Sequence, residues 1–411
     1  MGRFLVVVPP LEGHTNPTVV LGRELTDRGH EVAWTGYPEV MPGLLPAGAT
    51  FIPVADGAPA EVVEATAARN VAPAGGAVGF KALWEEFVLP IGRHMVPGTR
   101  AAVDRFVPDV LIVDQHALAG AAVALERGLP WATSATSSAD LVDPLAGLPK
   151  VARWLHDQVR EVLVGAGVAP DVAAAVDPRF SPHLLVAFTS PELVGATGFP
   201  EHWALVGPAV AARPDTTPFP WSWLAFEEPT VLVSLGTVNW RAGGRFFAVA
   251  AEALGAMDVR AVIVAPDDLV PDPPPNVLVR ARVPQVALLD HVDLVVGHGG
   301  HNTVCEALAA GVPLVLAPLR DDQPFVADQV VRAGAGERVK FGRITAPALR
   351  QVVTSVLTEP GYRTAAARLR ASFVAAGGAA AAADRLVGLL RAAPVGAPPA
   401  GWITTDHRRG P

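Results

Sequence analysis

The chain has 411 residues, of which half are hydrophobic and 18% are charged, and its formal net charge is −8. Such a composition excludes a disordered chain, which lacks the apolar residues needed for a core, and the acidic balance argues against a nucleic-acid groove or an anionic membrane surface as a partner. A single cysteine, Cys305, excludes a disulfide framework and any zinc site made of several cysteines.

Short β-branched runs, each followed by a stretch of helical length, repeat along the chain. The pairs of run and helix are 4–8 with 16–28, 110–113 with 117–127, and 230–234 with 245–257. Further runs lie at 261–264, 294–296 and 314–316, and the last two flank a predicted helix over 302–310. Apolar strands that alternate with helices predict an α/β fold in which helices cover both faces of parallel sheets.

A segment rich in proline and tryptophan, residues 211–228, separates two strand–helix series of similar length. We therefore expect two doubly wound domains, 1–210 and 229–392, that face each other across a cleft. The alanine-rich stretch 377–383 predicts a helix, and 393–411 has no periodicity and is expected to be a mobile tail.

No stretch reaches the roughly 18 to 20 uninterrupted apolar residues that a membrane span requires. The apolar run at 4–8 is too short for the core of a signal peptide and ends at two prolines. We expect a cytoplasmic protein.

The first candidate site follows the first predicted strand, where Gly13 to Pro17 leads into a helix. Ligands of doubly wound sheets bind at this carboxyl edge. Pro17 fits the first helical turn, and Thr15 or Asn16 fits the N-cap. His14 would then lie just ahead of the positive helix end, which favours a neutral imidazole that can accept a proton.

Asp114 ends the predicted strand at 110–113 and reaches the same edge. A carboxylate there could hold His14 in one tautomer and stabilise the cation that forms during a reaction. No serine or cysteine lies in a G-x-S-x-G motif, so a pair that activates a substrate hydroxyl is favoured over covalent catalysis. The alternative is that His14 caps a turn and Asp114 caps a helix.

The second candidate site is the segment 297–308, which follows a strand and opens a helix. Its paired glycines, Gly299 and Gly300, let an anion approach the backbone N–H groups at the positive helix end. His298 and Thr303 add side-chain donors, and Glu306 is placed to accept from ribose hydroxyls. A diphosphate is the ligand that this arrangement favours.

Other ligands fit this segment less well. The nicotinamide fingerprint G-x-G-x-x-G is incomplete, because Asn302 stands where its third glycine should be, and the Gly-Lys-Ser/Thr of a P-loop is absent. A zinc site at His298, His301 and Cys305 lacks a fourth ligand of suitable spacing. We expect no metal.

Two more segments end at the same edge of the second predicted sheet. Ser234 and Thr237 surround a glycine after the run at 230–234, and Asp322 and Gln323 follow the run at 314–316. A carboxylate beside an amide suits the recognition of sugar hydroxyls, although a solvated acidic loop would have the same sequence.

In order and spacing these segments resemble the nucleotide-sugar-dependent glycosyltransferases of family 1, and above all the actinobacterial branch that modifies antibiotics and other natural products. The resemblance covers nearly the whole chain apart from the tail, and the matching segments are 13–17, 25–32, 282–285, 298–306, 311–313 and 322–324. It implies the GT-B fold, in which two Rossmann-like domains with doubly wound parallel sheets face each other across a cleft.

The resemblance also implies an activity and its residues. The enzyme would be an inverting, metal-independent hexosyltransferase without a cofactor, which moves a sugar from a TDP- or UDP-sugar to a hydroxyl of an apolar aglycone. His14 would be the general base and Asp114 its partner, while Asp322 and Gln323 would read the donor sugar. The nucleotide and its diphosphate would lie against Ser234, Thr237, Val283, Gln285, His298, Gly299, Gly300, Asn302, Thr303 and Glu306. Val283 replaces an aromatic residue that plant members have, and His301 replaces their tryptophan, which leaves the nucleobase open.

The acceptor should lie against the first domain. Candidate contacts are Ser137, in the loop 134–143, and an aromatic stripe whose helical spacing suits core packing equally well: Phe80, Trp84, Phe87 and Met95. Alternative functions are a GT-B-like nucleotide-sugar epimerase, a non-catalytic partner that activates a glycosyltransferase, and a nicotinamide-dependent reductase. Expected partners are the sugar donor and a hydrophobic small-molecule acceptor, with no nucleic acid or membrane span, and the protein would be a monomer or a homodimer.

Overall fold

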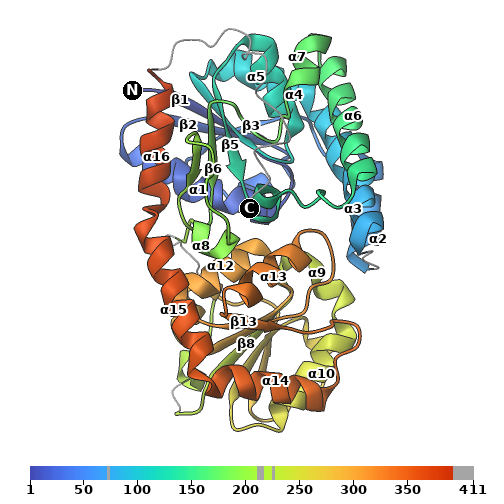
Figure 1. Ribbon diagram of the computed structural model, residues 1–411, viewed down its shortest axis with the longest axis vertical. Coiled ribbons are helices and arrows are strands. Elements are labelled where there is room, and N and C mark those ends of the chain that lie inside the picture. Colours follow the sequence, from blue (N-terminus) through green and yellow to red (C-terminus); the bar gives the residue numbers. More distant parts are fainter. Residues whose placement is uncertain (72–74, 211–216, 225–226, 392–411) are drawn as a thin grey trace.

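The computed structural model describes residues 1–71, 75–210, 217–224 and 227–391. It has two lobes, each built around one parallel sheet (Figure 1). The predicted α/β fold with two parallel sheets is confirmed. The predicted tail 393–411 and parts of the predicted linker, 211–216 and 225–226, lie outside the described residues.

The first sheet has seven strands in the order β3-β2-β1-β4-β5-β6-β7. Its strands are β1 (Arg3–Val7), β2 (Glu31–Gly36), β3 (Thr50–Pro53), β4 (Val110–Asp114), β5 (Trp131–Ala135), β6 (Leu184–Ala187) and β7 (Trp203–Leu205). Its helices are α1 (Glu12–Asp27), α2 (Ala60–Val71), α3 (Gly76–Leu83), α4 (Leu89–Phe106), α5 (Leu118–Arg127), α6 (Pro149–Gly165), α7 (Pro170–Ala175) and α8 (Pro191–Val194). A π-helical turn, Trp84–Val88, joins α3 to α4.

The second sheet has six strands in the order β10-β9-β8-β11-β12-β13. Its strands are β8 (Thr230–Ser234), β9 (Arg260–Val264), β10 (Val277–Arg280), β11 (Leu294–Gly297), β12 (Leu314–Leu316) and β13 (Gly336–Arg338). The helices that follow them are α9 (Gly236–Asn239), α10 (Gly244–Gly255), α11 (Gln285–Leu289), α12 (His301–Ala310), α13 (Gln323–Arg332), α14 (Ala346–Thr358), α15 (Pro360–Ala375) and α16 (Gly378–Leu389).

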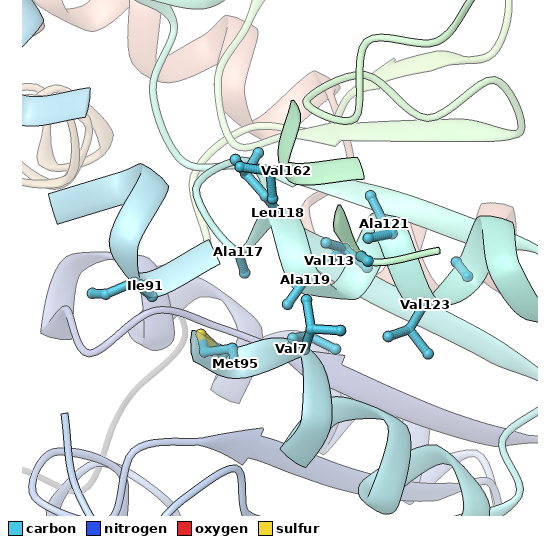
Figure 2. Close-up of a cluster of buried hydrophobic side chains, with 14 of the residues drawn as sticks. Val7, Ile91, Met95, Val113, Ala117, Leu118, Ala119, Ala121, Val123 and Val162 are labelled. Atoms are coloured by element: carbon cyan, nitrogen blue, oxygen red, sulfur yellow. The ribbon is translucent and has the colours of Figure 1, made fainter. Parts of the chain in front are cut away.

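The central strands are apolar because both of their faces are covered. Along β1, Val7 packs on one face with α4 and α5, whereas Val6 packs on the other face in a separate cluster. Figure 2 shows the first of these clusters, in which Val7 and Val113 lie among side chains of α4 and α5. The helix α5 fits closely because it is rich in small residues: a Cβ on Gly120 would lie 2.8 Å from Val113.

Helix α1 begins earlier than predicted. Its N-cap is Leu11 rather than Thr15 or Asn16, and Pro17 lies inside the helix. A proline has no N–H to donate to the carbonyl four residues earlier, here that of Gly13. The Gly13 carbonyl instead accepts a hydrogen bond from Asn302 Nδ2 of the other lobe at 2.6 Å.

The predicted alanine-rich helix is confirmed as α16. Although it falls within the range 229–392 of the predicted second domain, it packs against α1 and buries Ala382, Ala383 and Leu386 with core residues of the first sheet. Helices α15 and α16 run along one side of the molecule, from the second lobe to the first (Figure 1). Among the described residues no helix is both long and apolar enough to cross a membrane.

Candidate active site

The candidate residues of both lobes lie at the carboxyl edges of their sheets. In the first lobe, β1 and β4 are paired in register, as are Asp114 and Ser134 at the ends of β4 and β5. In the second lobe, Gly297 is paired with both Ser234 and Leu316. The loops after β8, β11 and β12 therefore start side by side, as the sequence predicts.

His14 and Asp114 form a direct pair. His14 Nδ1 lies 2.9 Å from both carboxylate oxygens, and Asp114 is almost completely buried. Thr136 Oγ1 lies 2.9 Å from the same nitrogen, and the His116 backbone N–H donates to Asp114 at 2.9 Å. A proton on Nδ1 satisfies the carboxylate and leaves Nε2 with the lone pair that a general base needs.

The electrostatics of His14 differ from the prediction. Burial lowers the pKa of His14, but the charge and hydrogen bond of Asp114, with smaller effects of Asp322 and Asp140, raise the pKa above its ordinary value. His14 lies within the first turn of α1, where the helix end favours a neutral ring as predicted, but the carboxylate of Asp114 outweighs this effect on the pKa. The nearby carboxylate decides the direction of the shift.

Aromatic rings lead from α3 to this pair. The His14 and His116 ring centroids are 4.9 Å apart, His116 meets Trp84 edge-on at 5.9 Å, and Trp84 lies 6.2 Å from Phe80. Trp84, Phe87 and Met95 are buried in the core cluster, and Phe80 packs against it partly buried. The stripe therefore serves core packing, and its predicted contact with an acceptor stays a prediction.

His14, Asp114 and His116 also form a cluster of potential metal ligands. Their ligand atoms lie within 4.8 Å of one another, and no other group of three or more His, Cys, Asp or Glu side chains in the described ranges meets this criterion. The alternative zinc set is not assembled there: Cys305 Sγ lies 3.5 Å from His301 Nε2, but His298 is not part of a group with them.

Glycines make room for the His298 ring in the second lobe. A Cβ on Gly300 would lie 2.4 Å from His298 Nε2, and one on Gly236 would lie 2.9 Å from its Cε1. Burial lowers the pKa of His298 to about 4, and the positive charge of Arg320 adds to this effect. Buried His298 Nδ1 has no hydrogen-bond partner among the described residues. At neutral pH this ring carries no charge, and its single N–H can donate either to the Ser234 backbone or to a ligand.

The other predicted donor-site residues lie around this loop. Gln285 Nε2 donates to Glu306 at 2.6 Å, so two of the residues predicted to contact the nucleotide are joined by a hydrogen bond. Gly299 has a φ of +86°, and a Cβ there would lie 3.1 Å from the Gln323 carbonyl. Thr237 is exposed, whereas Val283 and Thr303 are half-buried.

Three consecutive hydroxyls after β5 connect the two lobes. Thr136 contacts the His14–Asp114 pair, Ser137 donates to Asp322 at 2.6 Å, and Ser138 donates to Gln329 Oε1 and lies 3.3 Å from His301 Nδ1. Burial raises the pKa of Asp322 to about 6. The predicted proton-transfer pair and the predicted sugar-reading carboxylate are thus neighbours.

Buried Gln323 holds its own loop in place, because its Oε1 accepts from the backbone N–H of Leu319 at 2.9 Å and of Arg320 at 3.2 Å. Sequence reasoning missed Thr136, His116 and Arg320 as parts of the site. The polar run that follows β5 at the same edge is the signal that could have pointed to Thr136.

Sequence comparison gives one family match and several relatives. Residues 249–389 match the C-terminal domain of proteins like erythromycin biosynthesis protein CIII. The chain is 34% identical to 4'-demethylrebeccamycin synthase from Lentzea aerocolonigenes, over 94% of this chain and 99% of the relative. It is 30% identical to demethyllactenocin mycarosyltransferase from Streptomyces fradiae, over 95% and 87% of the two chains.

Structure comparison finds the same two-lobe architecture. The spinosyn rhamnosyltransferase SpnG, solved with thymidine diphosphate, superposes with a TM-score of 0.71 over 94% of this chain and all of that one. The sequences are 23% identical. At that identity the likeness establishes the fold.

Proposed function

Since the chain belongs to the actinobacterial natural-product glycosyltransferases with the GT-B fold, we propose that it transfers a sugar from a TDP- or UDP-sugar to a hydroxyl of an apolar natural-product aglycone, with inversion. The observation that carries this proposal is the contact between His14 Nδ1 and Asp114 at 2.9 Å. The reaction would take place in the cytoplasm, with the enzyme as a monomer or a homodimer.

In the proposed reaction His14 Nε2 takes the proton of the acceptor hydroxyl while the hydroxyl oxygen attacks the anomeric carbon. The bond between that carbon and the diphosphate oxygen breaks, and the nucleoside diphosphate leaves with the bonding electrons. A single displacement inverts the anomeric centre. Asp114 stabilises the imidazolium that forms, as its effect on the pKa of His14 indicates.

The leaving diphosphate would lie against the loops after β8 and β11. Backbone N–H groups at the N-terminus of α12 would donate to it, and neutral His298 would add a donor. Asp322 and Gln323 would read the sugar hydroxyls, so that the sugar competes with Ser137 for Asp322. The thymidine diphosphate bound to the similarly folded SpnG favours a thymidine nucleotide.

An apolar, ring-containing acceptor would meet the run of aromatic rings that leads to His14 at its half-buried members, Phe80 and His116. The histidine at the end of this run would place the acceptor hydroxyl beside its base.

His14→Ala tests the proposal. We expect it to abolish sugar transfer and to leave nucleoside diphosphate binding, measured by calorimetry, unchanged. Near-normal turnover by this variant would overturn the role of His14. Incubation of the wild type with nucleotide sugar alone identifies an epimerase, which would yield an epimer. Incubation with nucleotide sugar and a panel of acceptors identifies a non-catalytic partner, which would be inactive with every acceptor.

A further inference from the structure

Arg320 lies in the loop between β12 and α13. Because Leu316 pairs with Gly297, and Gly297 pairs with Ser234, this loop starts beside the two loops proposed to hold the diphosphate. The Arg320 side chain is only 6% exposed. A buried guanidinium is costly to a fold unless charge or hydrogen bonds compensate for its lost hydration.

The contacts of this guanidinium join three segments. Nε donates to Asn239 Oδ1 of α9 at 2.9 Å, and Nη2 donates to Asn70 Oδ1 of α2 in the first lobe at 2.9 Å. Asp321 Oδ2 lies 3.5 Å from Nε. The two asparagine oxygens are neutral, so they accept hydrogen bonds from the guanidinium without cancelling its positive charge.

That charge reaches the proposed diphosphate site. Asn239 ends the short helix that begins at Gly236, and the His298 ring lies directly over Gly236. The charge of Arg320 acts on His298, whose pKa it helps to lower. Because His298 is neutral, it cannot balance the two or three negative charges of a diphosphate, and a helix end supplies only about half a charge.

We propose that Arg320 is the cation that neutralises the donor diphosphate and makes the site select nucleoside diphosphates over monophosphates and nucleosides. This inference rests on the proposed function, which puts a nucleotide sugar at these loops. It adds a charged side chain to the backbone N–H groups and neutral donors that the sequence predicts for this site.

Arg320→Gln is the direct test, with calorimetric titration of thymidine, its monophosphate and its diphosphate, and of the uridine series. We expect diphosphate affinity to fall roughly tenfold to hundredfold, the range for a lost hydrogen bond to a charged group, and nucleoside affinity to stay constant. Asn70→Ala is the matched control: it removes one partner but keeps the guanidinium, so the preference for diphosphate should persist.

Asp321→Asn should change the diphosphate affinity in the opposite direction. The replacement has the same shape, and asparagine tolerates the left-handed backbone at this position, where φ is +53°. Removing the nearby negative charge should strengthen diphosphate binding several-fold without changing nucleoside binding. This variant keeps the proposal testable even if Arg320→Gln does not fold.

The outcomes separate the two proposals. If the wild type binds none of these nucleotides, the proposed function fails. If it binds diphosphates and both variants keep the wild-type ratio of diphosphate to nucleoside affinity, the function stands and the role of Arg320 is overturned.

Discussion

His14 and His298 occupy matching places in the two lobes and have opposite protonation behaviour. His14 follows strand β1 and lies in the first turn of α1, and His298 follows strand β11 and precedes α12. Both lie at the carboxyl edge of their parallel sheet. Asp114 raises the pKa of His14, whereas burial and the charge of Arg320 lower the pKa of His298 to about 4. Position in the fold brings a histidine to the site, and its burial and charged neighbours decide what it can do there.

This contrast divides the chemistry between the lobes. The first lobe holds a base whose cation is stabilised, as proton transfer requires. The second lobe holds a donor that stays neutral beside a cation, as anion binding requires. The predictions below test that division from the largest expected effect to the smallest.

Asp114→Asn should have the largest effect. The amide cannot stabilise an imidazolium, so we expect kcat to fall by about 10²- to 10⁴-fold with unchanged donor affinity. Steady-state kinetics and calorimetry together check both parts. Thr136→Val is the control, because it removes a neutral contact to the same pair and should cost far less. A near-wild-type kcat in Asp114→Asn would contradict the assignment of proton transfer to the first lobe.

Gly300→Ala should be next. Its Cβ would lie 2.4 Å from His298 Nε2, so the ring must move from its place and donor binding should weaken roughly tenfold to hundredfold. Gly13→Ala in the first lobe is the matched control, since its Cβ would lie 3.5 Å from Asn302 Nδ2, an ordinary contact. Equal donor affinities in the two variants would contradict a fixed place for His298.

The sequence alone predicts the α/β alternation and both carboxyl-edge motifs, because apolar strands and glycine-rich turns are local patterns. It does not predict the start of α1, since Pro17 locally favours a later start, and the Gly13 carbonyl that Pro17 leaves without a helical partner is bound by Asn302, far along the chain. Arg320 could not be found for the same reason: its partners Asn70 and Asn239 lie in other segments. Such contacts depend on tertiary packing.

Acidification should destabilise the fold through the neutral histidines. His298 and His301 both have folded-state pKa values of about 4, against about 6.5 when unfolded. The unfolded state binds more protons between these values, so stability present above pH 6.5 is lost toward pH 4, up to about 3 kcal/mol for each histidine.

Asp322 works in the opposite direction. Its pKa is raised to about 6, so its protonation stabilises the fold as pH falls from 6 toward 4 and offsets about as much stability as one of these histidines loses. Urea unfolding at pH 7.5 and pH 4.5 measures the difference in the free energy of unfolding between the two pH values. His301→Gln should reduce this difference. A difference unchanged in that variant would show that His301 is not neutral in the folded state.

Chelation of metal ions should have the smallest effect on the transfer rate. We expect EDTA to leave the transfer rate unchanged, because Arg320 and the N-terminus of α12 meet the charge of the leaving diphosphate. Added Zn²⁺ should instead inhibit, because it competes for the atoms that His14 and Asp114 use for each other, with His116 as a third ligand. His116→Asn should weaken that inhibition. If EDTA abolished transfer and Mg²⁺ restored it, a metal ion, and not the second lobe's own charges, would neutralise the leaving diphosphate.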